Sequence, residues 1–373
     1  MYFLDIETYS TDSFPNIETA NHEVNVITIY DSLTKQFTTW GTKPLTKPTQ
    51  QTNYIECRNE KEMFLKFLDF FEKDYPDILS GWNSEFFDVP YIINRLNALF
   101  GPDYAKRLSP VGKLSSRMFM SKYGKQQVRW YIEGVACIDY LDIYKKFCPK
   151  MRDSYKLNDV AETEEVGSKI DYGDQNLSSL ADNNWDTFVE YNVQDVNLLA
   201  ALEGKLKYLE LLRSIAYAGC TTFEGALGTL TVVNGLCAIK ARHKGLCIHT
   251  FNREIDENHK NEGAYVGDPQ RGFQEHIMSV DANSLYPNTM ITLNLSPETK
   301  IGKIEQGADG LVIVDHVNGQ QFKLTAKDFN DFLDREQISV SLAKVLFSQK
   351  KKGIVPEIVD EFYKRREIGR AHV

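Results

Sequence analysis

The chain has 373 residues, 42% of them hydrophobic and 12% aromatic, which allows two domains with sizeable cores and argues against intrinsic disorder. It contains no apolar run of about 18 residues and no basic-then-apolar amino terminus, so neither a membrane span nor a secretory signal is predicted. The net charge of −9 does not indicate a nucleic-acid binder, although a local basic track would be enough for phosphate contacts. Three basic clusters are candidates for such a track, and each taken alone is more often a solvated face: Lys240, Arg242 and Lys244; Lys350, Lys351 and Lys352; Lys364, Arg365 and Arg366.

Strands and helices alternate along the first half of the chain. Strands are predicted over residues 2–4, 25–30, 38–41, 78–81 and 135–140, and helices over 61–71, 89–99 and 185–212. The helix over 61–71 should be amphipathic, because Phe64, Phe67, Leu68 and Phe71 recur at helical spacing. Residues 123–125 lie between two extended runs and indicate a hairpin tip. This alternation predicts an α/β layer structure.

The second half of the chain shows weaker patterns. Residues 212–252 mix helix and turn signals and carry no catalytic signature. A second β-rich segment is predicted from about Gly263, with a strand over residues 277–280 that leads into a turn at Asp281.

Two carboxylate motifs occur in the first hundred residues. Asp5 and Glu7 follow an apolar run, and the period of two in a strand places both on one face while Ile6 points to the other. A solvent-facing strand edge would explain this pair about as well. Asp88 follows a loop that begins at Gly81, and a helix N-cap is the simpler explanation for it.

Asp195 is harder to explain without a function. It shares one helical stripe with Phe188, Leu199, Leu202 and Leu206, and an ionised carboxylate on an apolar stripe must be paired or must bind a cation. A salt bridge to a basic residue elsewhere in the chain is the alternative. Tyr191 precedes Asp195 by one turn and shares its face.

The order Asp-x-Glu, Asn-x4-Asp, Tyr-x3-Asp resembles the three motifs of the DEDD exonucleases, in the subclass with a tyrosine. This resemblance implies that Asp5, Glu7, Asp88 and Asp195 bind two divalent ions, which in such sites lie about 3.5–4 Å apart. Carboxylate oxygens suit Mg²⁺ or Mn²⁺. Tyr191 would orient the attacking water, and a stand-alone DEDD nuclease is an alternative function.

Four longer runs stand out along the chain: Gly81-Trp82-Asn83 with Phe87-Asp88-Val89-Pro90, Ile138-Asp139-Tyr140-Leu141-Asp142, Glu262-Gly263-Ala264-Tyr265-Val266 and Asp281-Ala282-Asn283-Ser284-Leu285-Tyr286-Pro287. These runs resemble the family B DNA polymerases of T-even phages. The resemblance implies an RNase H-like exonuclease domain over residues 1–208, a connecting segment over 209–252 and an incomplete α+β polymerase palm over 253–367. It further implies DNA contacts, and the residues expected to make them are Asn83, Phe87, Gly263, Ala264 and Tyr265.

The same resemblance assigns the polymerase residues. Asp281 would bind catalytic Mg²⁺, the backbone of Ser284 and Leu285 would face a deoxynucleoside triphosphate, and Tyr286 would exclude a 2′ hydroxyl; a turn aspartate and a core tyrosine are the simpler alternatives. No Lys-x3-Asn-Ser-x-Tyr-Gly run and no Asp-Thr-Asp follow, so we expect a fragment without polymerase activity of its own. A lysine that some relatives carry about a dozen residues before the motif tyrosine is expected to be missing, with Ser179 near its place.

The remaining expectations concern the setting of the chain. Residues 368–373 depart from the family and are interpreted as a non-native tail. The resemblance implies a phage protein in the cytoplasm of a bacterial host, with DNA and a sliding clamp as partners of the full-length enzyme. A non-catalytic DNA-binding remnant is a further alternative, against which the intact acids argue.

Overall fold

The computed structural model describes residues 1–9, 15–47, 51–120, 126–173, 176–248, 266–307 and 311–371. The chain divides into two compact units, Met1–Val232 and Val233–Val373, here called unit 1 and unit 2. The domain limits predicted from the sequence at residues 208, 252 and 367 stay predictions.

Unit 1 is built on a six-stranded sheet with the strand order β4-β3-β2-β1-β5-β8. Its strands are β1 (Tyr2–Thr8), β2 (Val24–Asp31), β3 (Gln36–Gly41), β4 (Asn53–Glu56), β5 (Ile78–Gly81) and β8 (Ala136–Asp139). Strands β1, β2 and β3 are antiparallel, whereas β4 is parallel to β3, β5 to β1 and β8 to β5. All five strands predicted in this half are present, and β4 was not predicted.

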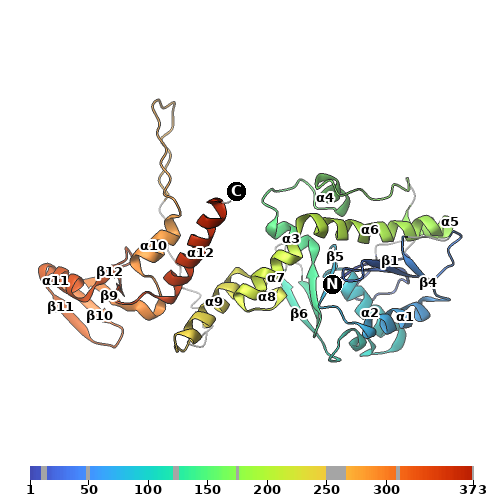
Figure 1. Ribbon diagram of the computed structural model, residues 1–373, viewed down its shortest axis with the longest axis horizontal. Coiled ribbons are helices and arrows are strands. Elements are labelled where there is room, and N and C mark those ends of the chain that lie inside the picture. The colour runs from blue at the N-terminus through green and yellow to red at the C-terminus, as the bar shows by residue number, and fades with distance from the viewer. Residues whose placement is uncertain are drawn as a thin grey trace. The chain divides into compact units, whose positions relative to one another are not determined.

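Helices cover both faces of this sheet, which confirms the predicted α/β class (Figure 1). They are α1 (Glu60–Lys73), α2 (Asp88–Phe100), the 3-10 helix η1 (Tyr104–Leu108), α3 (Tyr140–Phe147), α4 (Leu157–Thr163), α5 (Leu177–Asn183), α6 (Trp185–Leu206), α7 (Tyr208–Gly219) and α8 (Phe223–Ala226). Strand β1 shows how the two faces separate: Leu4 and Ile6 belong to the core with α1 and α2, and Phe3 belongs to the core with α3, α4 and α6. Asp5 and Glu7 alternate with Leu4 and Ile6, so they lie on the face that α6 covers.

The amphipathic helix predicted over residues 61–71 is α1. Asn59 caps it by accepting a hydrogen bond from the backbone of Glu62, and its four predicted core residues are all buried. Phe67 packs edge-to-face on Trp40 with ring centroids 5.6 Å apart. Burial of an aromatic side chain stabilises the fold by about 1.5–3 kcal/mol, so these contacts hold α1 on the sheet.

The single helix predicted over residues 185–212 is wrong, because two helices, α6 and α7, occupy it. Lys207 joins them in the left-handed conformation, with φ 54°, which ends α6. The Glu203 carboxylate then accepts hydrogen bonds from the backbone of Leu209 at 3.0 Å and Glu210 at 3.3 Å, so it caps the start of α7. A lysine carries no sequence signal for such a break.

A separate two-stranded ribbon, β6 (Leu114–Met120) and β7 (Gln126–Ile132), forms the predicted hairpin. Its predicted tip at residues 123–125 lies outside the described residues. Arg129 of β7 connects the ribbon to the rest of unit 1, because its guanidinium lies 2.5 Å from the Glu85 carboxylate and 3.7 Å from that of Asp142.

Unit 2 contains a five-stranded antiparallel sheet with the order β11-β10-β9-β13-β12. Its elements are α9 (Thr229–His243, which begins in unit 1), α10 (Leu285–Leu293), the 3-10 helix η2 (Pro297–Thr299), β9 (Lys300–Gln306), β10 (Val312–His316), β11 (Gln321–Leu324), α11 (Ala326–Glu336), β12 (Ile338–Val340), β13 (Val345–Ser348) and α12 (Ile354–Ala371). Val314, Phe329 and Leu346 form the centre of a small core between the sheet and α11.

The strand predicted over residues 277–280 is wrong. The segment has no strand structure, and Ile277, Met278 and Val280 are 78–84% exposed. A strand needs a neighbour to pair its backbone groups, and the described strands of unit 2 pair only with one another. Asp281 therefore lies in an exposed segment without regular structure before α10 and not at the end of a strand.

Acidic side chains neutralise much of the basic clusters of unit 2. Lys240 and Lys244 lie 3.3 and 2.6 Å from Glu357, and Lys350 lies 2.6 Å from Glu336. These pairs favour solvated, ion-paired faces over a continuous basic track.

Candidate active site

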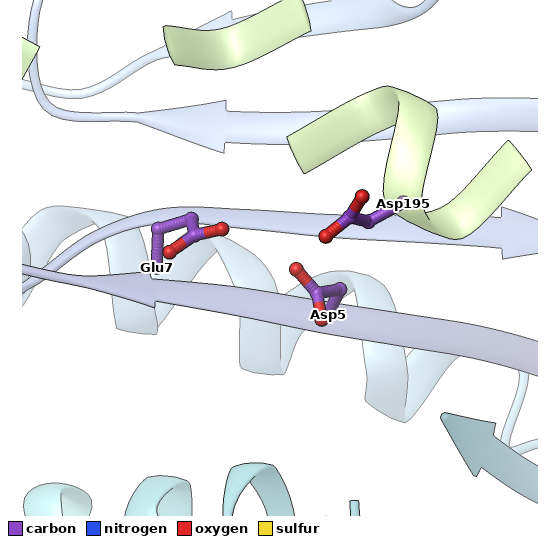
Figure 2. Close-up of side chains that lie close together, drawn as sticks. All are labelled: Asp5, Glu7 and Asp195. Carbon is purple, nitrogen blue, oxygen red and sulfur yellow. The ribbon is translucent and has the colours of Figure 1, made fainter. Parts of the chain in front are cut away.

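Three carboxylates from distant parts of the sequence meet on the α6 face of the sheet. Asp5 and Glu7 extend from β1 and Asp195 extends from α6, and Figure 2 shows the three side chains pointing toward one another. One ligand oxygen from each lies within 4.8 Å of the others. The predicted stripe of α6 explains the placement of Asp195, since Phe188, Leu199 and Leu202 of that stripe are buried.

Asp88 lies at the start of α2, next to this group. Its Oδ1 accepts a hydrogen bond of 3.2 Å from the backbone of Ile6, the residue between Asp5 and Glu7, and it is buried. Phe87 holds the cap position of α2, so Asp88 is not the N-cap that the simpler explanation required. Its oxygens are not part of the 4.8 Å group, and its role as a fourth metal ligand stays a prediction.

The electrostatics of these acids favour protons or a cation. Burial raises the pKa of Asp5 well above its usual range, and the charges of Asp88, Glu7 and Asp195 raise it further. Burial and the charge of Asp195 raise the pKa of Glu7 to about 8, and burial raises the pKa of Asp88 to about 7. Several buried carboxylates cannot all ionise here without a positive charge beside them.

The donor set fits a hard divalent cation. All three side chains of the group offer carboxylate oxygens, which Mg²⁺ and Mn²⁺ prefer to nitrogen or sulfur. Asp195 Oδ1 is buried and accepts no hydrogen bond within the described part of the chain, so it has a lone pair available for an ion.

A lysine that the sequence analysis missed lies against these acids. Lys169 Nζ forms an ion pair with Asp195 Oδ2 and donates a hydrogen bond of 2.9 Å to the Tyr191 hydroxyl. Burial alone would lower the pKa of Lys169, but the charge of Asp195 and the hydrogen bonds raise it. No lysine stands about a dozen residues before Tyr191, near Ser179, as expected from the sequence. The acids nevertheless face a lysine, because Lys169 reaches them from the loop before α5, 22 residues before Tyr191.

One sequence signal could have pointed to this lysine. Lys169 is the only Lys or Arg between Lys156 and Lys205, a stretch otherwise rich in Asp and Glu. The salt-bridge partner considered as an alternative for Asp195 is thus present, and it lies beside the other acids.

The loop between β5 and α2 carries Asn83 and Phe87, two of the residues expected to contact DNA. Asp139, at the end of β8, holds this loop by accepting hydrogen bonds from the backbone of Asn83 at 3.0 Å and Glu85 at 3.3 Å. Asn83 adopts a left-handed conformation with φ 61°, and the Phe87 ring stacks on Tyr91 with centroids 5.6 Å apart. These contacts fix the path of the loop into Asp88.

The predicted nucleotide-binding residues lie in unit 2. Ser284 has φ 50° and precedes α10, and Leu285 and Tyr286 in its first turn are 58% and 73% exposed. Asp281 belongs to no group of three metal-ligating side chains among the residues that the structure describes. Gly263, Ala264 and Tyr265 lie outside the described residues.

Comparison with known families agrees with the fold and the acidic site. Residues 2–160 match the model for the exonuclease domain of family B DNA polymerases, and residues 229–372 match the model for DNA polymerase family B. Together they define an RNase H-like domain of exonuclease type followed by part of a polymerase palm. The chain belongs to the family B DNA polymerases, which confirms the predicted resemblance.

Its relatives include phage and eukaryotic enzymes. The chain is 29% identical to the DNA-directed DNA polymerase of Enterobacteria phage T4 and 28% identical to that of Escherichia phage RB69, each over 97% of this chain and 41% of the relative. It is 28% identical to the DNA polymerase delta catalytic subunit of Candida albicans, over 85% of this chain and 29% of the relative. The chain thus spans about two fifths of the length of the phage relatives. Within the described residues, no helix has the length and apolar character to cross a membrane.

Proposed function

We propose that unit 1 is the 3′→5′ proofreading exonuclease of a DNA-directed DNA polymerase and removes nucleotides from the 3′ end of DNA with Mg²⁺ or Mn²⁺. The observation that carries the proposal is the group of Asp5, Glu7 and Asp195, whose ligand oxygens lie within 4.8 Å of one another. The match of residues 229–372 to a polymerase model favours this function over a stand-alone nuclease.

The carboxylates would hold the ions, with Asp88 as the fourth ligand. Two bound ions would lower the pKa of an attacking water and stabilise the departing 3′ oxygen. Asp5 and Glu7 stand on one rigid strand and Asp195 on a buried helix, so the ligand positions are set before DNA arrives.

Tyr191 would orient the water. Because the Lys169 ammonium has only donors, the Tyr191 oxygen accepts from it, and the hydroxyl hydrogen remains for another acceptor. Burial raises the pKa of Tyr191 above its usual range, so it stays protonated at neutral pH and acts as a donor and not as a base. Lys169 holds this hydroxyl and Asp195 together.

The other roles belong to a longer polymerase. Asn83, Phe87, Gly263, Ala264 and Tyr265 would contact the DNA, and Asp281, Ser284, Leu285 and Tyr286 would contact Mg²⁺ and a deoxynucleoside triphosphate. A sliding clamp would be a further partner, and the bacterial host cytoplasm the place of action. This chain alone has a single motif of the polymerase site, so we expect exonuclease activity from it and no nucleotide incorporation.

The test is the shortening of single-stranded DNA labelled at its 5′ end by the purified chain. We expect stepwise loss from the 3′ end with Mn²⁺ or Mg²⁺, and none with chelator or in Asp195→Ala. Asp186→Ala is the matched control, because Asp186 lies on the same helix and contacts Thr46, away from the acidic group. Equal activity in Asp195→Ala and the wild-type chain would refute the proposal, and so would a wild-type chain without activity, the result that a non-catalytic remnant predicts.

A further inference from the structure

Asn192 is a polar side chain buried in the contact between α6 and the sheet. It is 0% exposed, and Phe188, Val193 and Val196 of the same helix are buried with it. Its amide nitrogen donates a hydrogen bond of 2.6 Å to Asp5 Oδ2. When Asp5 is ionised, as cation binding requires, it can only accept, so the amide nitrogen is the group that serves it.

The amide is a poor choice for stability alone. Its Oδ1 is buried and accepts no hydrogen bond within the described part of the chain. Burying a polar group costs free energy unless its hydrogen bonds are made, and among the described residues only the nitrogen of this amide has a partner, which is Asp5. Packing of α6 on β1 and β2 therefore does not explain an asparagine here.

The contact does explain how Asp5 is held. The amide occupies one oxygen of Asp5, and in Figure 2 an Asp5 oxygen points toward Asp195. The donor is neutral, so it can fix the carboxylate without adding the positive charge that Lys169 brings to Asp195. A neutral donor orients an anionic ligand and leaves its charge for a cation, which is the usual work of groups behind a metal ligand.

We propose that Asn192 is a positioning residue that orients Asp5 for divalent cation binding. The proposal rests on the proposed function, because it presumes that Asp5 is a metal ligand. Asn192 itself touches neither DNA nor the ion in this account, and it acts through Asp5.

The experiment measures Mn²⁺ binding to the full chain by electron paramagnetic resonance of free Mn²⁺, together with urea unfolding. In Asn192→Leu, which removes the amide and keeps its shape, we expect the dissociation constant for Mn²⁺ to rise about 10–100-fold. The variant should stay folded in chelator, with an unfolding midpoint lowered only by the loss of one hydrogen bond to Asp5. Asn197→Leu is the matched control, because Asn197 is exposed on the same helix and its amide donates a hydrogen bond to Gln194, and it should leave Mn²⁺ affinity unchanged.

Two outcomes would overturn the proposal. An unchanged Mn²⁺ affinity in Asn192→Leu would show that Asp5 needs no orienting group, and a chain that loses its fold would show that the amide serves stability. Asn192→Ala, which adds no bulk, must show the same loss of affinity, so steric disturbance by leucine cannot imitate the effect. Nuclease activity of either variant should recover at high Mn²⁺ concentration.

Failure of the proposed function can be distinguished from failure of the proposal for Asn192. If the wild-type chain binds no Mn²⁺ at the acidic group, so that Asp195→Ala leaves binding unchanged, the metal site itself is refuted. If the wild-type chain binds Mn²⁺ through Asp195 and Asn192→Leu binds it equally well, only the role of Asn192 is refuted.

Discussion

Replacing Lys169 with methionine removes the ammonium group that pairs with Asp195 in the acidic site. Methionine keeps most of the length and apolar character of the lysine side chain but leaves Asp195 beside Asp5 and Glu7 without its ion pair. The Tyr191 hydroxyl loses its hydrogen-bond donor as well. In the absence of metal, the acids must then either repel one another or hold more protons.

The magnitude follows from burial. The Asp195 side chain is 7% exposed and that of Lys169 is 27% exposed, so the pair is largely but not fully removed from water. Breaking a fully buried pair costs about 3–5 kcal/mol, and a hydrogen bond to a charged group contributes about 1.5–3 kcal/mol. For this partly screened pair we expect Lys169→Met to lower the free energy of unfolding of unit 1 by about 2–3 kcal/mol in chelator.

The assay uses the positions of the tryptophans in the sequence. All four tryptophans, Trp40, Trp82, Trp130 and Trp185, lie in unit 1, so tryptophan fluorescence during urea unfolding reports on that unit alone. Lys106→Met is the control: Lys106 lies 3.1 Å from Asp103 in an exposed pair, and its loss should cost less than about 1 kcal/mol.

Added divalent cation separates this explanation from simple loss of packing. Mg²⁺ or Mn²⁺ bound at the carboxylates would supply the missing positive charge, so saturating metal should recover much of the lost stability. A loss of stability that is the same with and without metal would refute the view that Lys169 acts as the counter-ion of the metal-free site. If Lys169→Met is as stable as the wild-type chain, the expected loss of about 2–3 kcal/mol in the free energy of unfolding is refuted.

Three further predictions concern unit 1. The pKa values of Glu7 and Asp88 are raised to about 8 and about 7, so both groups bind protons more tightly in the folded than in the unfolded chain. Stability in chelator should therefore be highest at acidic pH and fall as the pH rises through these values. Urea unfolding at several pH values measures this, and stability that rises over the same range would contradict it. Glu203→Ala should lower the free energy of unfolding by about 1–3 kcal/mol, because the backbone donors that start α7 and the Tyr140 hydroxyl lose their acceptor. The control Glu210→Ala, at an exposed position, should have little effect. Equal unfolding midpoints for the two variants would rule out the capping role of Glu203. Arg129→Met should destabilise unit 1 by about 2 kcal/mol at pH 8 and by less at pH 5.5, because Glu85 is 5% exposed and burial raises its pKa to about 7, so it is charged only at the higher pH. Arg117→Met on the same ribbon is the control. An equal loss of stability in both variants would count against a specific ion pair between Arg129 and Glu85.

The sequence predicts the parts of the fold that repeat a local pattern. Alternation in β1 and helical spacing in α1 and α6 depend on near neighbours in the chain, so these elements and the faces they bury were predicted. The break at Lys207 depends on a side-chain cap that Glu203 provides, and it leaves no periodic trace. The failed strand over residues 277–280 has strand-forming residues but no partner strand among the described residues.

The residues of the candidate site were likewise only partly predictable from the sequence. Motif order and a helical stripe predicted that Asp5, Glu7, Asp88 and Asp195 converge, and the structure brings three of them together, with Asp88 outside the 4.8 Å group. Lys169 was missed because it lies in an irregular loop, where spacing carries no information about tertiary contacts. Asn192 sits between the predicted Tyr191 and Asp195, but only the tertiary structure shows that its amide reaches Asp5.

The central position of β1 affects when the site can form during synthesis. β1 is an inner strand of the sheet, and the residue that holds Asp5 follows 187 positions later in the chain. At a translation rate of about 5–20 residues per second, a ribosome needs roughly 10–40 seconds to add those residues. During that interval β1 and β2 can pair as a hairpin, but Asp5 and Glu7 have no α6 to cover them. A nascent chain that stops before α6 therefore carries two acids of the site on an exposed strand, and the metal site closes only once α6 has emerged from the ribosome.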